Sequence, residues 1–139
     1  FVFGGWNGSS PLSCVEMMDL NTQAWMTLPS MKHKRSGCSA GVIGHFVIVV
    51  GGYDGNRRLN TAELFNLTTH QWMDLPDMSH PHVYGALVVI ETRAYVIGGR
   101  NNIYVEVFDL ESRKWMTSPS MEANFSEGIA AVAVGRLIV

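Results

Sequence analysis

The stretch EMMDLNTQAWMTLPSM, at residues 16–31, decides how this chain folds, because the chain contains three versions of it. It returns as ELFNLTTHQWMDLPDM at 63–78 and as EVFDLESRKWMTSPSM at 106–121. In each copy a Glu precedes the Trp by nine residues, and the Trp precedes a closing Met by six. One such unit cannot bury its own apolar face, and a period of about 45 residues is typical of propeller and solenoid arrays. The sequence therefore predicts a row of stacked repeats.

An apolar run that ends in two glycines precedes each copy. The three runs are FVFGG at 1–5, FVIVVGG at 46–52 and YVIGG at 95–99. Turns of hairpin length separate the second and third runs from further apolar segments upstream, and a Pro follows each Trp where a strand would end. Four short antiparallel strands per repeat, without helical periodicity, predict an all-β fold made of propeller blades.

The repeat spacing also predicts where the units begin and end. Repeat periods are expected at about 1–47, 48–94 and 95–139, with complete blades at about 37–76 and 84–119. The chain begins and stops inside expected strands, so we expect about three four-stranded blades cut from a longer ring, with one blade split between the termini. Exposed strand edges and apolar blade faces would favour self-association of the isolated chain.

Composition and charge narrow the classes of function. The formal net charge is −2 and the Lys and Arg residues are scattered, so we expect no nucleic-acid partner. The apolar runs are too short to span a membrane, so no membrane partner is expected either. Cys14 and Cys38 form neither a disulfide framework nor a zinc pattern, which favours a cytoplasmic location. Glycosylation sequons at Asn7, Asn66 and Asn124 favour export instead.

The motifs resemble the kelch repeat over the whole chain. The matching features are the diglycine after an apolar strand, the Glu-x-[Phe/Met]-Asp-Leu-like strand, and the Trp at a fixed distance from the Glu. The Met-x-x-Leu-Pro-x-Met pattern, followed by Lys34-Arg35-Ser36-Gly37, is most similar to the kelch domains of BTB-kelch proteins. The third copy departs from the pattern, because its loop from Gly99 to Glu106 is four residues shorter and Ser118 replaces a Leu. The resemblance implies a kelch β-propeller of six blades.

The residues that recur in every copy are interpreted as structural. Glycine pairs let neighbouring backbones approach closely, and each Trp offers a large apolar body for the gap between blades. The recurring Glu is interpreted as a hydrogen-bond or salt-bridge partner, because carboxylates in separate blades cannot form one catalytic site. The residues given a structural role are Gly4, Gly5, Gly51, Gly52, Gly98, Gly99, Trp25, Trp72, Trp115, Glu16, Glu63 and Glu106.

Function is expected where the copies differ, in the loops after each diglycine and after each Pro-x-Met. Both loop sets emerge at one rim of a four-stranded meander, and by resemblance BTB-kelch proteins bind short client segments there. Aromatic and Arg side chains suit an extended, partly acidic peptide. The expected contact residues are Trp6, Arg35, Tyr53, His82, Arg100, Asn102 and Phe125. The remaining cations of these loops are interpreted as solvated charges: Lys32, Lys34, Arg57 and Arg58.

Enzyme motifs are absent from the sequence. His80-Pro-His82 has no third ligand nearby, and Gly51–Gly55 lacks the ending of a phosphate-binding loop, so we expect no catalytic residue, metal or cofactor. The predicted function is protein recognition, most specifically substrate recognition for a cullin-type ubiquitin ligase whose BTB and BACK regions would lie outside this chain. The alternatives are an actin-binding kelch protein and, less favoured, a secreted copper enzyme related to galactose oxidase.

Overall fold

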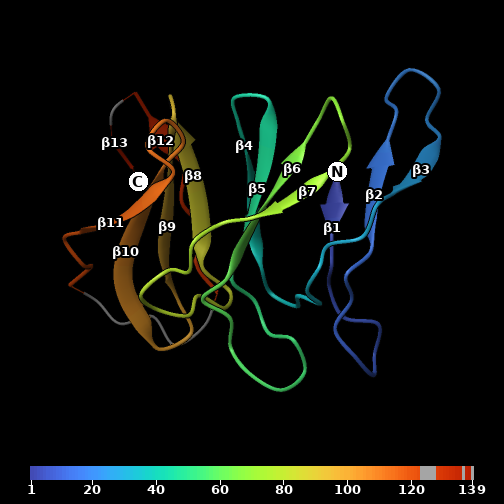
Figure 1. The fold of residues 1–139 in the computed structure, drawn as a ribbon. Helices are drawn as coiled ribbons and strands as arrows, with labels where there is room; N and C mark the ends of the chain where they lie inside the picture. The colour runs from blue at the N-terminus through green and yellow to red at the C-terminus, as the bar shows by residue number, and fades with distance from the viewer. Residues whose placement is uncertain (123–127, 136, 139) are drawn as a thin grey trace.

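The computed structural model describes residues 1–122, 128–135 and 137–138, which form strands, turns and loops (Figure 1). Two four-stranded antiparallel sheets lie at its centre, and consecutive strands are neighbours in both. The first sheet contains β4 (Ser39–Ile43), β5 (Phe46–Val50), β6 (Ala62–Asn66) and β7 (Trp72–Asp74). The second sheet contains β8 (Ala86–Ile90), β9 (Arg93–Gly99), β10 (Asn102–Asp109) and β11 (Lys114–Ser118).

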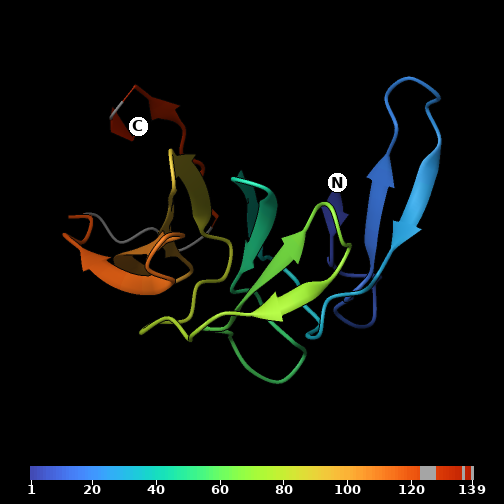
Figure 2. The ribbon, with the colours of Figure 1, turned by 45° about the horizontal axis from the view of Figure 1, so that its top comes forward.

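Two smaller sheets flank the central pair, one on each side. One contains β1 (Val2–Phe3), β2 (Val15–Met18) and β3 (Trp25–Leu28), and the other is the hairpin of β12 (Ala133–Val134) and β13 (Leu137–Ile138). Figure 2 shows the sheets standing beside one another like the blades of a fan. Antiparallel meanders stacked in this way are propeller blades, so the predicted all-β propeller fold is confirmed.

The hydrophobic core lies between the sheets. Leu64 of β6 packs with Phe108 of the second four-stranded sheet, and both side chains are fully buried. The next residue of β6, Phe65, packs with Val15 of the three-stranded sheet instead. Successive side chains of a strand point to opposite faces of the sheet, so β6 contributes core residues to the contacts with both neighbouring blades. Each blade is therefore stabilised by its neighbours.

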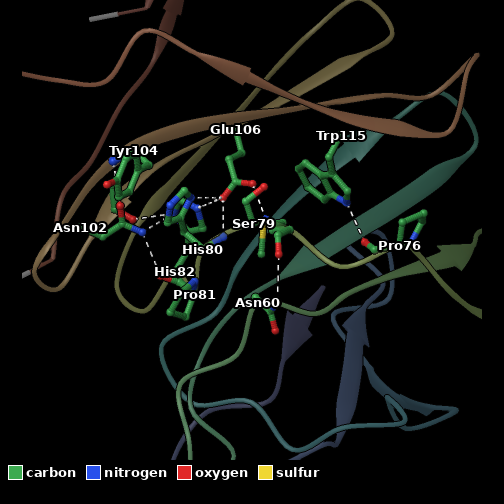
Figure 3. A network of polar contacts seen from close by, with 12 residues as sticks. Asn60, Pro76, Ser79, His80, Pro81, His82, Asn102, Tyr104, Glu106 and Trp115 are labelled. Carbon is green, nitrogen blue, oxygen red and sulfur yellow. Dashed lines mark hydrogen bonds and ion pairs between the residues drawn. The ribbon is translucent and has the colours of Figure 1, made fainter.

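The repeated tryptophans join each blade to the one before it. The Nε1 of Trp72 donates a hydrogen bond of 2.8 Å to the carbonyl oxygen of Pro29, and that of Trp115 donates one of 2.7 Å to Pro76 (Figure 3). Trp25 has no such partner among the described residues, and its side chain is 54% exposed. The fixed spacing of Trp and Pro in the sequence therefore reflects a contact between consecutive repeats.

The Asp or Asn that ends each repeated strand closes the turn after it. The side chains of Asp19, Asn66 and Asp109 each accept hydrogen bonds from backbone amides two or three residues further on. Such Asx turns let a short polar side chain replace a backbone acceptor. The position is therefore occupied by Asp or Asn in all three copies.

The diglycines bring the rim loops against the blades. The Gly52 amide donates to the His82 carbonyl oxygen at 2.7 Å, and the Gly5 amide donates to that of Arg35 at 2.8 Å. A Cβ atom on Gly51 would lie only 2.0 Å from the His82 oxygen. Only glycine leaves room for this approach, so the first two diglycines each fix the loop that follows their own blade.

Candidate functional site

The two variable loop sets meet at one end of the blades. The loops after β5 and after β7 emerge at the same end of their sheet (Figure 1). Tyr53 and Ser36 exchange backbone hydrogen bonds of 2.8 and 2.9 Å, and the Arg100 amide donates to the Val83 carbonyl oxygen at 2.7 Å. These contacts join the diglycine loop of one blade to the loop that enters the same blade, so the rim is a continuous surface.

A hollow of about 560 Å³ opens at this rim. Its lining combines aromatic rings and guanidinium groups from three successive repeats. We call it the rim hollow, and its lining residues are Trp6, Ser36, Tyr53, Arg58, Val83, Tyr84 and Arg100. Trp6 and Tyr84 are 53% and 46% exposed, so large apolar surface is available to a ligand there.

The charge of the rim hollow is positive. The Nη1 of Arg58 donates to the backbone carbonyl of Arg100 at 3.3 Å, which holds one guanidinium beside the loop that carries the other. Among the described residues, neither Arg58 nor Arg100 has a carboxylate partner, whereas Arg57 lies 3.7 Å from Asp54. The Arg57 and Asn56 amides hold the pKa of Asp54 below its usual range. Two guanidinium groups are thus left for an anionic ligand.

Arg35 is not part of this surface, which corrects the expectation that it contacts a partner. Its side chain is fully buried and crosses to the next blade, where Nε and Nη2 lie 3.1 and 3.0 Å from Glu63 Oε1. Nη1 donates to the carbonyl oxygens of Gly51 and Thr61, and Nη2 also donates to the Thr61 hydroxyl. All five N–H donors of the guanidinium are used inside the protein, so none remains for a ligand.

His82 and Asn102 require the same correction. His82 is 2% exposed, with Nδ1 at 2.7 Å from the Gly98 carbonyl oxygen and Nε2 at 3.0 Å from Glu106 Oε2 (Figure 3). Asn102 is also buried, and its Nδ2 donates to the Pro81 carbonyl oxygen at 2.9 Å. Both side chains are buried beneath the rim loop, and their hydrogen bonds hold its backbone in place.

Glu106 is the centre of this buried network. Its carboxylate accepts from His82 and from the backbone amides of Ser79 and His80, at 2.6 Å for Ser79 and 3.0 Å for His80. Burial alone would raise the pKa of Glu106, but these hydrogen bonds outweigh it and hold that pKa below its usual value. One repeat earlier, Glu63 accepts from the equivalent groups, the amides of Lys32 and His33 and the Arg35 guanidinium, whereas Glu16 is exposed and makes no such contact with the described residues.

The structure adds two residues that the sequence did not select and leaves one undescribed. Trp6, Tyr53 and Arg100 come together in the rim hollow, but so do Arg58 and Tyr84. Phe125 lies outside the described residues. The sequence could not show that Arg58 rather than Arg57 lines the rim hollow, since the two are adjacent cations of one loop.

Tyr84 did carry a signal in the sequence. It aligns with Gly37 in the preceding repeat, and both residues have positive φ, 57° for Tyr84 and 64° for Gly37. A bulky residue at positive φ is a backbone outlier, and such outliers cluster at functional sites. The Tyr84 ring lies over Gly37, where a Cβ atom would come within 2.5 Å of it. A tyrosine at a glycine position therefore marks the rim hollow.

Metal and membrane features are absent from residues 1–122, 128–135 and 137–138. There, no three His, Cys, Asp or Glu side chains gather closely enough to hold a metal ion. This part of the chain also has no helix long and apolar enough to cross a membrane. Cys14 and Cys38 are both free, and burial raises the pKa of the Cys38 thiol.

Comparison with known proteins assigns the repeats to a family. The family model described as the KLHDC2/KLHL20/DRC7 Kelch-repeats domain matches residues 1–138. An Arabidopsis thaliana protein named F-box/LRR-repeat/kelch-repeat protein At2g29770 is 52% identical over 40 residues, which are 27% of this chain and 10% of that protein.

A solved structure supports the fold. The structure of YjhT superposes with a TM-score of 0.78 at 16% identity, over 94% of this chain and 52% of that one. The chain thus spans about half of the solved relative and a tenth of the curated one. At this identity the superposition shows the fold alone, whereas the family model matches nearly every residue of the chain. The chain therefore belongs to the KLHDC2/KLHL20/DRC7 Kelch-repeats domain family.

Proposed function

We propose that this chain recognises a partner protein by binding an extended, acidic segment of it in the rim hollow. Kelch-repeat domains generally bind protein partners, and this chain is one of them. The observation that carries the proposal is the convergence of Arg58 and Arg100 with three aromatic rings in one hollow. Guanidinium groups bind carboxylates in bidentate fashion, and Tyr, Trp and Arg are the side chains enriched in binding hot spots.

The rim hollow is also prepared for binding before a ligand arrives. Its loops are held by backbone hydrogen bonds between Ser36 and Tyr53 and between Val83 and Arg100. Below them, the buried Arg35 and His82 side chains fix the same loops to the next blade. A rigid site loses little conformational entropy on binding, so more of the contact energy appears as affinity.

A defined peptide tests the recognition proposal. A fluorescein-labelled oligoglutamate peptide should bind the chain in fluorescence anisotropy, with affinity that falls as salt rises, whereas oligolysine should not bind. Arg58→Glu and Arg100→Glu should each weaken binding about tenfold or more, as expected for loss of a charged hydrogen bond. Arg57→Glu is the matched control, because Arg57 is a neighbouring cation outside the rim hollow. An equal loss in the control, or no binding at all, would contradict the proposal.

The finer proposal is that the partner is a client for a cullin-type ubiquitin ligase in the cytoplasm. Support comes from the resemblance to BTB-kelch proteins and from the Arabidopsis relative, whose name combines kelch repeats with an F-box and leucine-rich repeats. Kelch repeats in that relative thus accompany other modules in one chain. BTB and BACK regions, or an equivalent ligase-binding module, would have to be present elsewhere in the protein.

Affinity capture tests the ligase proposal with the full-length protein as bait. The bait is compared with a variant in which Trp6, Tyr53 and Arg100 are changed to Ala. A cullin should be recovered with both baits, and a set of client proteins should be lost with the variant. Absence of a cullin with either bait would overturn the ligase proposal. Co-sedimentation with actin filaments would then test the actin-binding alternative.

A further inference from the structure

The loop after the first diglycine contains the only Asn-Gly pair in the sequence, Asn7-Gly8. An asparagine before glycine is the pair most prone to deamidation, because glycine has no side chain to shield its backbone nitrogen from the asparagine Cγ. Both residues are exposed, so hydroxide and water reach them. Among the described residues the Gly8 amide donates no hydrogen bond, whereas the amides of Asn7 and Ser9 both do. The Gly8 nitrogen is therefore available to react.

The side-chain carbonyl of Asn7 is held by three donors. Its Oδ1 accepts from the Ser9 amide and the Ser9 hydroxyl, both at 3.0 Å, and from the Ser10 amide at 2.8 Å. Backbone amides only donate, so the side-chain atom that faces them is the oxygen. Donors aimed at a carbonyl oxygen stabilise the negative charge that develops there when a nucleophile attacks the carbon, as in an oxyanion hole. The loop thus activates Asn7 Cγ toward the neighbouring nitrogen.

The next repeat has the same loop with the product residue already in place. Asp54-Gly55 aligns with Asn7-Gly8, and the two glycines have φ values of 101° and 97°. The Oδ1 of Asp54 accepts from the amides of Asn56 and Arg57, both at 2.8 Å, in the turn geometry that Asn7 has in its own loop. These amides hold the pKa of Asp54 below its usual range. An aspartate therefore fits this loop conformation and is ionised there at neutral pH.

We propose that Asn7 is a site of spontaneous deamidation, which converts it into aspartate or isoaspartate and adds a negative charge beside the rim hollow. Gly8 loses its amide proton to hydroxide, and its nitrogen bonds to Asn7 Cγ. The Cγ–Nδ2 bond then breaks, and the leaving nitrogen takes a proton from water and departs as ammonia. Water opens the resulting succinimide ring at Cγ to give aspartate, or at the backbone carbonyl carbon of Asn7 to give isoaspartate. The net reaction consumes water and releases ammonia, without a change of oxidation state.

The new charge lies next to the proposed binding surface. Trp6, the neighbour of Asn7, lines the rim hollow together with Arg58. The loop that Trp6 and Pro11 close also lies against the next rim loop, since a Cβ atom on Gly55 would come within 3.4 Å of Pro11. A carboxylate there repels an acidic segment, and isoaspartate also lengthens the backbone of the loop that carries Trp6. This effect on binding rests on the proposed function, whereas the modification itself does not.

Peptide mapping by mass spectrometry tests the modification in the folded 139-residue chain. During incubation at mildly alkaline pH, Asn7 should be lost to aspartate and isoaspartate while Asn56 stays intact. Asn56 is the matched control, because it is exposed in the equivalent loop of the next repeat but is followed by Arg57. Methylation by an isoaspartate methyltransferase identifies the isoaspartate product. Equal loss of both asparagines, or an intact Asn7, would overturn the proposal.

Two serine variants test the activation of Asn7 by its loop. Ser9→Ala removes the hydroxyl donor and should slow deamidation by about threefold to tenfold, as expected for the loss of one exposed hydrogen bond. Ser10→Ala is the matched control, because Ser10 bonds to Asn7 through its backbone amide, which the substitution retains. Circular dichroism reports whether each variant remains folded. Equal rates in the wild-type chain and both variants would show that the donors do not activate Asn7.

Binding of the oligoglutamate peptide tests the consequence for the rim hollow. Asn7→Asp should weaken binding by about twofold, the effect of one unit charge at about 10 Å in water, and added salt should remove the difference. Asn7→Ser is the neutral control, since Ser also accepts hydrogen bonds in turns of this kind. If the wild-type chain binds the peptide and the two variants bind it equally well, the proposed effect of the charge is wrong. If the wild-type chain does not bind the peptide, the recognition proposal fails, and peptide mapping still decides the modification.

Discussion

His82 occupies the position in its loop that Arg35 occupies in the preceding repeat, and both side chains cross to a buried glutamate of the next blade. Arg35 reaches Glu63 and the Gly51 carbonyl oxygen, whereas His82 reaches Glu106 and the Gly98 carbonyl oxygen. The two side chains differ in size and chemistry, yet each lies within hydrogen-bond distance of an equivalent pair of groups, a glutamate carboxylate and a glycine carbonyl oxygen. The contact is therefore a repeated feature of the boundary between blades, and it holds the rim loops in position.

Loss of Arg35 should lower stability. Arg35→Ala leaves Glu63 buried without its cation, and removal of one partner of a buried ion pair costs about 3–5 kcal/mol. Urea denaturation followed by tryptophan fluorescence measures the free energy of unfolding. Arg57→Ala is the control, since Arg57 is an exposed cation near the same rim, and a change within about 0.5 kcal/mol is expected there. A stable Arg35→Ala protein would show that the buried pair contributes little.

Glu106 should make stability depend on pH in the acid range. Its pKa in the folded chain lies below the ordinary value of 4.5. A carboxyl of this kind contributes stability that is fully present above its unfolded pKa and is lost as pH falls through the folded pKa. The difference in thermal midpoint between the wild-type chain and Glu106→Gln should therefore be largest at neutral pH and shrink below pH 4.5.

The matched variant for this test is Glu111→Gln, because Glu111 is exposed in a turn. Its thermal midpoint should follow that of the wild-type chain throughout the titration. A difference between wild type and Glu106→Gln that stays constant from neutral to acid pH would contradict the role assigned to the ionised Glu106.

Tyr84 should contribute to binding at the expense of stability. With φ at 57°, a residue with a Cβ atom is strained by about 1–2 kcal/mol, and glycine relieves that strain. Tyr84→Gly and Tyr84→Ala both remove the ring from the rim hollow, so both should weaken binding of the oligoglutamate peptide. Tyr84→Gly should nevertheless be more stable than Tyr84→Ala by about 1 kcal/mol, after the larger unfolded-state entropy of glycine is included. Equal stabilities of the two variants would argue against backbone strain.

Gly51 should tolerate no side chain. An added Cβ atom would lie 2.0 Å from the His82 carbonyl oxygen. That oxygen also accepts the hydrogen bond from the Gly52 amide, so the loop cannot move it away without breaking this bond. Gly44 provides the comparison, because its φ of 59° is close to the 64° of Gly51 but its nearest neighbour is a methyl group of Leu110. Gly44→Ala should cost about 1–2 kcal/mol, and Gly51→Ala should cost clearly more. Chemical denaturation of both variants decides the order.

The sequence was sufficient to predict the fold because the residue types that form the strands, the turns and several of the contacts between repeats recur from one repeat to the next. The Trp and Pro, the paired glycines and the Glu recur at fixed distances, and where the contacts form they join neighbouring repeats. Local patterns of alternation and turn residues then predict four strands per repeat. The rim was also predictable, since a four-stranded meander places both variable loops at one end.

The sequence did not determine which rim residues face solvent. Arg35 and Arg100 are both loop cations, and only the docking of one loop on the next blade buries the first and leaves the second exposed. Burial of that kind depends on contacts between residues that are 16 to 28 positions apart, such as Arg35 with Gly51 and Glu63, and no local pattern records them. The repeats are local and periodic, so the sequence by itself determined the blades. The candidate site forms where three successive repeats meet, so only the tertiary structure decided which residues line it.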